Sequence, residues 1–168
     1  GLDAAHVVTG GATRDASVRA GLKALATNPP DNVLIHDAAR PLVSAAIITD
    51  VIAALDHHAG AAPAIAVTDA LWTGAEGFVS GSQNRSGLFR AQTPQGFHYA
   101  AIVSAHDQRT DPAVDDVEVA RDAGLDVAIV AGEEQNLKIT TEADFSRAAK
   151  MLGHDMDVRC GNGYDVHR

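Results

Sequence analysis

The sequence has few aromatic residues, one cysteine and no long apolar run, and each shortage excludes something. A single cysteine, Cys160, cannot form an internal disulfide, which is typical of a reducing compartment such as the cytoplasm. No apolar stretch approaches membrane-spanning length and no secretory leader is visible, so we expect a cytoplasmic protein without a membrane partner. With aromatic residues at 4%, the core must consist of Ala, Val, Ile and Leu.

Positive charge is also scarce. The chain has 13 Lys and Arg against 22 Asp and Glu, which gives a net charge of −9 at pH 7. A protein that binds a phosphate backbone needs a basic face, so we expect no nucleic-acid partner. A small anionic ligand is compatible with this charge, because a few local cations and backbone N–H groups suffice to bind it. The length of 168 residues, 46% of them apolar, is enough for one domain with its own core.

Short apolar runs alternate with helical patterns along the chain. Strands are expected at residues 6–9, 32–36, 64–67, 126–130 and 137–140. A helix is expected at 97–109, and Ser44, Asp115 and Thr141 are expected to cap the starts of three others. Strands that alternate with crossover helices predict an α/β fold, in which a mostly parallel sheet is covered by helices on both faces. Residues 68–86 are rich in glycine and contain two short apolar pairs, so they predict a protruding β-hairpin arm.

The composition changes after Leu152, and this predicts two unequal parts. Residues 1–153 form the main domain. Residues 154–168 do not continue the helical period of the preceding segment, and they are predicted to be a linker that runs into the first strand of another domain.

The sequence VLIHDAARPLV (33–43) places a carboxylate where a buried strand ends. Ligands of open α/β sheets bind beyond the carboxyl ends of the strands. Asp37 at that position can hold a hard cation such as Mg²⁺, which prefers oxygen ligands. Arg40 keeps its charge at neutral pH, so it can pair with Asp37 or face an anion. The alternative is that Asp37 only caps the turn and Arg40 only forms a salt bridge with it.

Three other segments carry polar residues near strand ends, although each has an ordinary structural explanation. Residues 10–17 (GGATRDAS) combine two glycines with a helix start, which also fits a plain tight turn. Residues 84–97 (NRSGLFRAQTPQGF) contain two arginines and a proline break. Residues 133–141 (EEQNLKITT) place Lys138 just before a helix, where a lysine is usually solvated.

In this order the segments resemble those of one family, the 2-C-methyl-D-erythritol 4-phosphate cytidylyltransferases of non-mevalonate isoprenoid (terpenoid) biosynthesis. The resemblance rests on GGATRDASVRAGL, VLIHDAARPLV, RAQTPQGF, the Asp115-Asp116 helix start and NLKIT, and it covers nearly all of residues 6–152. It implies a Rossmann-like nucleotidyltransferase sheet. It also implies a transferase that passes the cytidylyl group of CTP to a polyol phosphate, 2-C-methyl-D-erythritol 4-phosphate, and releases pyrophosphate.

The resemblance implies roles for the residues that match the family motifs. Asp37 would hold Mg²⁺ between the CTP phosphates, and Lys138 would lie near the reacting phosphates. Arg85 and Thr93 would bind the sugar phosphate. Because Arg85 lies on the arm at 68–86, and this arm reaches across a two-fold axis in the family, the resemblance also implies a homodimer with shared sites.

The remaining implied contacts concern the nucleotide. Gly11, Ser17 and Ala38 would border the cytosine and the ribose, and Arg40 would shape its loop and touch the nucleotide. The family often has threonine where this chain has Ala70, with a lysine shortly after, so a hydroxyl contact and a cation are expected to be missing there. The family often has threonine at the position of Val114 as well, and both changes are expected to weaken the contacts with the substrate.

The end of the chain resembles the start of a second enzyme, a 2-C-methyl-D-erythritol 2,4-cyclodiphosphate synthase. In that lyase family an Asp-x-His pair supplies two ligands of a catalytic Zn²⁺, and a further divalent ion is used. Asp165 and His167 match this pair. Positions i and i+2 of a strand point to the same face, so both side chains can reach one metal ion.

The two resemblances together imply a multifunctional enzyme of which this chain is the middle. The cytidylyltransferase family opens with a βα unit whose glycine-rich loop grips CTP, and no such unit precedes Gly1 here. We therefore expect the 168-residue chain alone to be inactive and the full-length fusion to form a higher oligomer. Two alternatives stay open at this point: a cytidylyltransferase for another polyol phosphate, such as ribitol or glycerol phosphate, and a non-catalytic dimerisation module.

Overall fold

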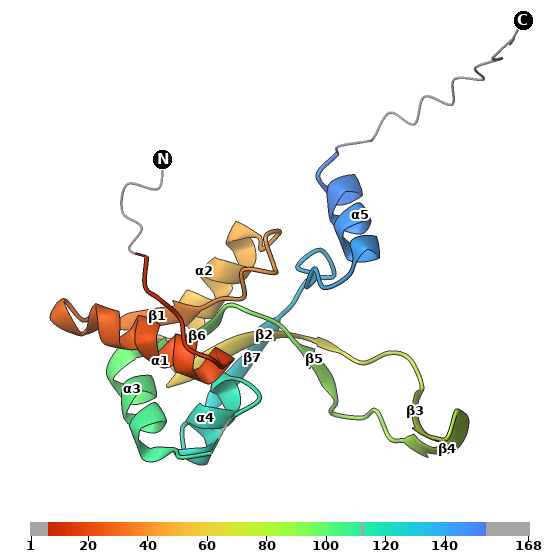
Figure 1. The fold of residues 1–168 in the computed structure, drawn as a ribbon, viewed down its shortest axis with the longest axis horizontal. Helices are drawn as coiled ribbons and strands as arrows, with labels where there is room; N and C mark the ends of the chain where they lie inside the picture. Colours follow the sequence, from red (N-terminus) through yellow and green to blue (C-terminus); the bar gives the residue numbers. More distant parts are fainter. Residues whose placement is uncertain (1–6, 112, 154–168) are drawn as a thin grey trace, which may run out of the picture.

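The computed structural model describes residues 7–111 and 113–153, which form a sheet with helices on both faces and a projecting hairpin (Figure 1). The described strands form one five-stranded sheet and one two-stranded sheet. The strands are β1 (Asn32–Ile35), β2 (Gly60–Ala66), β3 (Leu71–Ala75), β4 (Phe78–Gln83), β5 (Phe89–Ala91), β6 (Gln95–His98) and β7 (Val127–Ala131).

The helices begin where the local sequence provides a cap. They are α1 (Arg14–Ala24), the short 3₁₀ helix η1 (Leu25–Thr27), α2 (Ala45–Ala54), α3 (Tyr99–Gln108), α4 (Asp116–Asp122) and α5 (Glu142–Met151). Ser44 accepts a hydrogen bond from the backbone N–H of Ile47, and Asp115 and Thr141 cap α4 and α5 in the same way. Such caps satisfy backbone donors that have no partner inside the helix.

The larger sheet is mixed, with strand order β1-β6-β2-β5 and with β7 paired to β2. Strand β6 lies between β1 and β2 and runs antiparallel to both, β5 is antiparallel to β2, and the β2–β7 pair is parallel. The α/β fold class is confirmed, but the sheet of the described residues is not mostly parallel. The reason is that β5 and β6, separated by the segment 92–94, return along β2 in the opposite direction.

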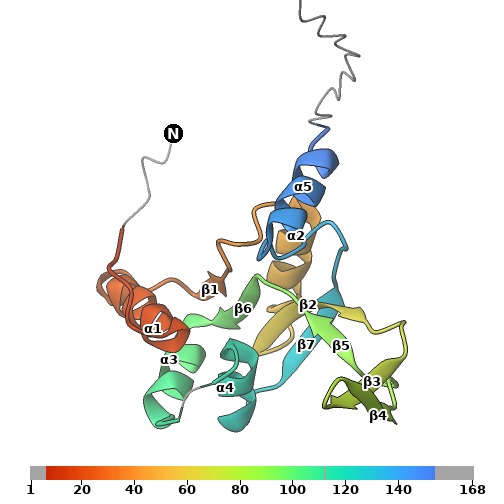
Figure 2. The same ribbon diagram turned by 45° about the vertical axis from the view of Figure 1, so that its right-hand side comes forward.

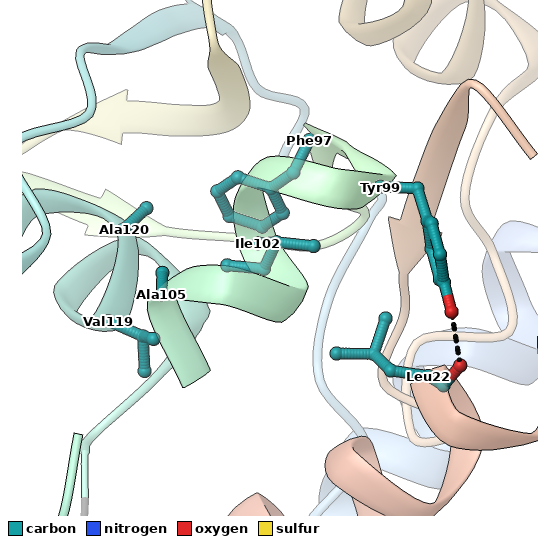
Figure 3. Close-up of a cluster of buried hydrophobic side chains, with 7 residues drawn as sticks. All are labelled: Leu22, Phe97, Tyr99, Ile102, Ala105, Val119 and Ala120. Atoms are coloured by element: carbon teal, nitrogen blue, oxygen red, sulfur yellow. Dashed lines mark hydrogen bonds between the residues drawn. The ribbon is translucent and has the colours of Figure 1, made fainter. Parts of the chain in front are cut away.

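The two faces of the sheet bury separate apolar clusters, because successive side chains of a strand point to opposite faces. On β1, Val33 and Ile35 pack against the cluster formed with α1, α3 and α4, whereas Leu34 packs against the cluster formed with α2. Figure 3 shows the first cluster, in which the Tyr99 hydroxyl also donates a hydrogen bond of 2.8 Å to the Leu22 carbonyl. Helices therefore cover both faces, as predicted.

The hairpin arm is confirmed. Strands β3 and β4 pair with each other and project from the sheet on the side away from α1 (Figures 1 and 2). Trp72, Phe78 and Val79 on the arm are exposed to 70%, 79% and 61%. None of the described helices has the length and apolar character needed to cross a bilayer.

Three expected elements differ from the structure. Residues 7–9 are not in a strand, and His6 lies outside the described residues. Residues 137–140 are not in a strand either, because their backbone contact with the Asp37 turn is a single hydrogen bond, from Ile139 N to Ala39 O at 2.8 Å. Phe97 belongs to β6 and is fully buried, so the helix expected at 97–109 begins at Tyr99 instead.

Candidate active site

Asp37 lies two residues beyond the end of β1, where the chain turns, and Arg40 N donates a hydrogen bond of 2.9 Å to the Asp37 carbonyl. The Asp37 side chain is 18% exposed, and three cations lie near its carboxylate. Lys138 Nζ is 3.0 Å from Oδ2, Arg14 Nε is 3.8 Å from Oδ1, and Arg40 Nε is 3.8 Å from Oδ2. The negative charge of the Asp37 carboxylate is therefore compensated mainly by Lys138, which lies far from Asp37 in the sequence.

Arg40 connects three loops rather than pairing tightly with Asp37. Its two terminal nitrogens donate to backbone carbonyls, to Asn136 O at 2.6 Å and to Ala91 O at 3.2 Å. Burial lowers the pKa of the Arg40 guanidinium from its usual range, and the nearby Asp37 carboxylate opposes this effect. Arg40 therefore holds the loops of Asn136 and Ala91 against the Asp37 turn.

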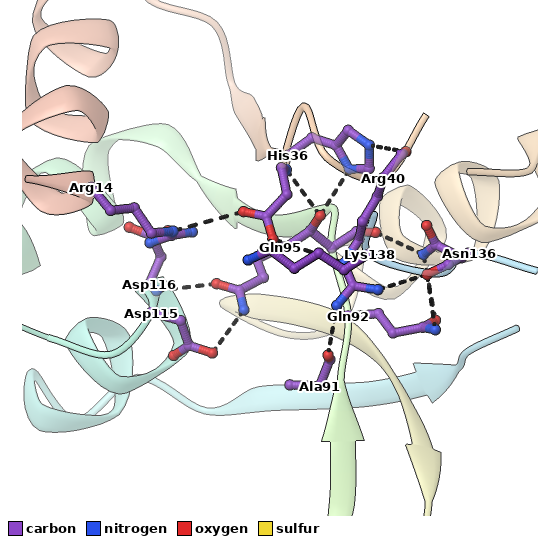
Figure 4. A network of polar contacts seen from close by, with 12 residues as sticks. Arg14, His36, Arg40, Ala91, Gln92, Gln95, Asp115, Asp116, Asn136 and Lys138 are labelled. Atoms are coloured by element: carbon purple, nitrogen blue, oxygen red, sulfur yellow. Dashed lines mark hydrogen bonds and ion pairs between the residues drawn. The ribbon is translucent and has the colours of Figure 1, made fainter. Parts of the chain in front are cut away.

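The segment between β5 and β6 ties the site together through Thr93. The Thr93 hydroxyl oxygen accepts a hydrogen bond of 3.0 Å from Asp37 N and lies 3.0 Å from His36 Nδ1. His36 Nε2 in turn lies 3.0 Å from the Arg40 carbonyl oxygen. The end of β1, its turn and the Thr93 loop are thus held in one arrangement, part of the polar network in Figure 4.

Two glutamines on either side of Thr93 extend this network. Gln95 Nε2 donates to Asp115 Oδ2 at 2.9 Å, and Gln95 Oε1 accepts from Asp116 N at 3.1 Å, so Gln95 fixes the start of α4. Gln92 Nε2 donates to the Glu133 carbonyl at 2.8 Å. The fully buried Asn136 donates to the Thr93 carbonyl at 2.9 Å, which fixes the loop that carries Lys138.

A cavity of about 150 Å³ opens at this network. Its lining includes Arg14, Asp37, Arg40, Thr93, Asp115 and Lys138. A neighbouring cavity of about 240 Å³ shares Arg40 and Lys138 with it. The arrangement combines one carboxylate, several cations and a hydroxyl group, which is a set of groups suited to bind phosphates together with a hard cation.

Four of the residues expected in the site do not line this cavity. Gly11 N donates to the Ser17 hydroxyl at 3.0 Å, and Ser17 faces a separate, apolar cavity of about 450 Å³ between α1 and β1. Ala38 is exposed in the Asp37 turn. Arg85 follows β4 and donates to the Thr68 carbonyl at the base of the arm. Asp37, Arg40, Thr93 and Lys138 are the expected residues that the structure brings together.

The donor set at Asp37 fits Mg²⁺ when a ligand brings phosphate oxygens. Mg²⁺ is usually held by one or two carboxylates and fills its remaining positions with water and phosphate oxygens. Within the described residues, no cluster of three or more His, Cys, Asp or Glu side chains could hold a metal ion without such help. Asp165 and His167, expected to bind Zn²⁺, lie outside the described residues.

The sequence and the fold match those of known proteins. The family model described as IspD, 2-C-methyl-D-erythritol 4-phosphate cytidylyltransferase, matches residues 2–154. The chain belongs to this cytidylyltransferase family. Among solved structures, the 2-C-methyl-D-erythritol 4-phosphate cytidylyltransferase of Thermus thermophilus superposes with a TM-score of 0.80 at 34% identity, over 86% of this chain and 71% of that one. The resemblance seen in the sequence is therefore confirmed.

Curated relatives of the IspD family include longer proteins. A bifunctional enzyme IspD/IspF from Ruegeria pomeroyi is 64% identical over 159 residues, which are 95% of this chain and 42% of that protein. A 2-C-methyl-D-erythritol 4-phosphate cytidylyltransferase from Roseobacter denitrificans is 60% identical over 146 residues, or 87% of this chain and 66% of that protein. The chain thus spans less than half of the bifunctional relative and about two thirds of the shorter one.

Several residues of the network escaped the sequence analysis. Arg14 and Asp116 form an ion pair of 2.7 Å at the rim of the cavity, and His36, Gln92 and Asn136 hold its loops. The sequence marks Asp116 only as part of a helix start. No local spacing signals these contacts, because most of them join residues far apart in the chain.

Proposed function

We propose that the full-length protein transfers the cytidylyl group of CTP to 2-C-methyl-D-erythritol 4-phosphate, giving CDP-methylerythritol and pyrophosphate. The observation that carries this proposal is the pairing of Asp37 with Lys138 at 3.0 Å on a small polar cavity, in a chain of the IspD family. A carboxylate that can hold a hard cation and a partly exposed ammonium group at one place suit nucleotidyl transfer, which depends on positioning and charge neutralisation.

The reaction is an in-line displacement at phosphorus. An oxygen of the 4-phosphate attacks the α-phosphorus of CTP, the bond from that phosphorus to the β-phosphate oxygen breaks, and pyrophosphate leaves with the electron pair. The protein supplies position and charge neutralisation. Lys138, whose side chain is 48% exposed, neutralises negative charge on the reacting phosphates, and Thr93 holds the Asp37 turn in place. Mg²⁺, held by Asp37, would screen the charge of the CTP phosphates.

The exposed arm supports a homodimer. Trp72 and Phe78 lie on the arm, away from the two apolar clusters of the domain, and Arg85 lies at the base of the arm. A second copy that covers these side chains would remove a large apolar surface from water. Arg85 would then serve the site of the partner, which agrees with its absence from the lining of the Asp37 cavity of its own chain. We place the reaction in the cytoplasm, where CTP and sugar phosphates are available.

The bifunctional relatives support a second activity in the parent protein. Their printed name joins IspD with IspF. We propose that Asp165 and His167 begin a cyclodiphosphate synthase, a lyase that uses Zn²⁺ and a further divalent ion and releases CMP. Isothermal titration of Zn²⁺ into the metal-free full-length protein and its Asp165→Asn and His167→Gln variants tests this proposal. Undiminished zinc affinity in both variants would rule out the assigned ligands.

The transferase proposal is tested with the full-length protein, CTP, Mg²⁺ and 2-C-methyl-D-erythritol 4-phosphate. ³¹P NMR should show the diphosphate product and free pyrophosphate. Asp37→Asn should raise the Mg²⁺ concentration needed for half-maximal rate, since a neutral amide is a weaker ligand. An unchanged Mg²⁺ requirement would contradict the role of Asp37.

The acceptor is identified by competition. Ribitol phosphate and glycerol phosphate are offered together with 2-C-methyl-D-erythritol 4-phosphate in the same assay. Preference for one of the alternatives would identify that compound as the acceptor. Absence of transfer to all three compounds would favour a non-catalytic dimerisation module.

A further inference from the structure

Arg14 occupies the rim of the candidate active site from the first turn of α1. Its NH2 nitrogen is 2.7 Å from Asp116 Oδ2, and its Nε is 3.8 Å from Asp37 Oδ1. The side chain is 37% exposed and lines the Asp37 cavity. In Figure 4 its guanidinium lies beside Asp116, at the start of α4. Arg14 is thus held from one side by a carboxylate and is open to the cavity on another.

The group that holds Arg14 is itself deeply buried. Asp116 is 1% exposed, and its other oxygen, Oδ1, lies 3.0 Å from Nε2 of His106, which is 2% exposed. The second ring nitrogen of His106 lies 3.3 Å from Asp15 Oδ1 without forming a hydrogen bond. A buried carboxylate is costly unless it is paired. The Asp116 side chain, with Oδ1 hydrogen-bonded to His106 and Oδ2 in ion-pair contact with Arg14, therefore has a fixed orientation.

Of the three cations near Asp37, Arg14 and Lys138 are the more exposed ones. Arg40 is 11% exposed, and its terminal nitrogens are engaged by the carbonyls of Asn136 and Ala91. Lys138 and Arg14 are 48% and 37% exposed. An anion that enters meets these two side chains. A guanidinium has five N–H donors in a planar fork, so it can bind Asp116 and a phosphate at the same time.

We propose that Arg14 is a further phosphate-binding residue of this site, and that His106 is a positioning residue that acts on Arg14 through Asp116. The phosphate belongs to a bound substrate or to the departing pyrophosphate. The kinetic part of this inference depends on the proposed transferase function, whereas the binding part does not.

The binding experiment uses inorganic pyrophosphate as the probe and the full-length protein. Isothermal titration should show at least about 10-fold weaker binding for Arg14→Gln, since the lost contact is a charge-assisted one. Arg14→Lys keeps a positive charge beside Asp116 and so preserves the fold, but it lacks the fork and should bind several-fold more weakly. Lys23→Gln removes one exposed charge from the same helix, outside the cavity, and should leave the affinity unchanged.

The positioning role of His106 is tested by a double-mutant cycle. His106→Gln keeps one N–H donor for Asp116 but not the ring geometry, and should weaken pyrophosphate binding about three-fold. In the Arg14→Gln background the same change should have no further effect. Additive losses would show that His106 does not act through Arg14 and would overturn that half of the inference.

The kinetic experiment assigns the phosphate. If Arg14 contacts CTP, Arg14→Lys raises KM for CTP, and if it contacts the acceptor, KM for the polyol phosphate rises. A purely structural tether between α1 and α4 predicts the opposite pattern: a lower melting temperature with pyrophosphate affinity and both KM values unchanged, which would overturn the inference. Failure of the wild type to bind pyrophosphate would overturn it as well. Normal binding without turnover would reject the transferase function and leave the assignment of Arg14 intact.

Discussion

Lys138 Nζ lies 3.0 Å from Asp37 Oδ2, although the two residues belong to loops at opposite ends of the described chain. The contact forms because two hydrogen bonds hold the Lys138 loop against the Asp37 turn. Ile139 N donates to Ala39 O at 2.8 Å, and the Arg40 side chain donates to the Asn136 carbonyl. A charged pair at 18% and 48% exposure is partly screened by water, so its contribution to folding is small. We expect the pair to be more important for binding a ligand that contacts both charges.

Replacing Lys138 by Gln should lower kcat more than it raises KM. The ammonium group would stabilise charge that grows on the phosphates as the bond to pyrophosphate breaks, and removal of one such donor typically costs on the order of 10²-fold in rate. Steady-state kinetics of the full-length protein measure the split. Lys150→Gln, an exposed lysine on α5, is the matched control. A rise in KM at constant kcat would instead mean that Lys138 only binds the ground state.

Thr93→Val should destabilise the protein and reduce activity. Valine has nearly the shape of threonine but leaves Asp37 N without the hydroxyl acceptor that it now has at 3.0 Å. An unsatisfied, partly buried donor costs about 1–3 kcal/mol. Urea unfolding measures the loss, and Thr93→Ser, which keeps the hydroxyl, should recover most of it. Full stability of Thr93→Val would show that the hydrogen bond to Asp37 N does not stabilise the fold.

Two glycine-to-alanine changes should have opposite signs. A Cβ on Gly96, in β6, would lie 2.5 Å from Val51 Cγ1 and 3.3 Å from Leu55 Cδ1, so α2 would have to move, at a cost of about 1–3 kcal/mol. A Cβ on Gly21, inside α1, meets no heavy atom within 4 Å. Gly21→Ala should therefore stabilise the helix by about 0.5–1 kcal/mol. Thermal unfolding compares them, and Val51→Ala should partly rescue Gly96→Ala. Stabilisation by both changes would contradict the close approach of β6 to α2.

The parts of the fold that local sequence controls could be predicted. The caps Ser44, Asp115 and Thr141 and the glycine-rich arm depend on neighbours within a few residues, and the structure confirms them. The direction of β5 and β6 could not be predicted, because strand direction is set by pairing partners that lie far away in the chain. Residues 137–140 have a strand-like composition but lie against a turn, so they form no ladder.

For the site, the motifs gave the individual residues but not their grouping. In the structure, Asp37 contacts both Thr93 and Lys138. Arg85 does not join them within one chain. The contact between Arg14 and Asp116 has no local signature, since it depends on how α1 and α4 pack over the same face of the sheet.

The start of α5 should make a pH-dependent contribution to stability. The Thr141 hydroxyl donates to Asp144 Oδ2 at 2.9 Å, and the N–H groups of Thr141 and Thr140 donate to the same oxygen at 3.1 and 3.2 Å. These hydrogen bonds, that of the Thr141 side chain first, lower the pKa of Asp144 below its ordinary value of 3.8. A carboxyl group with a lowered pKa stabilises the folded helix fully above that ordinary value. The stabilisation is lost as the pH falls through the lowered pKa of the folded state.

Amide hydrogen exchange in α5 reports this contribution directly, because amides at a helix end exchange when that end opens locally. Thr141→Ala removes both the cap and the first cause of the pKa shift. It should reduce protection by about 1 kcal/mol at neutral pH and weaken the dependence of protection on acid. Asp144→Asn should abolish that dependence. Thr49→Ala, an exposed position inside α2, is the control and should leave α5 unchanged. Protection that falls with acid as steeply in Asp144→Asn as in the wild type would show that another group titrates at this end of the helix.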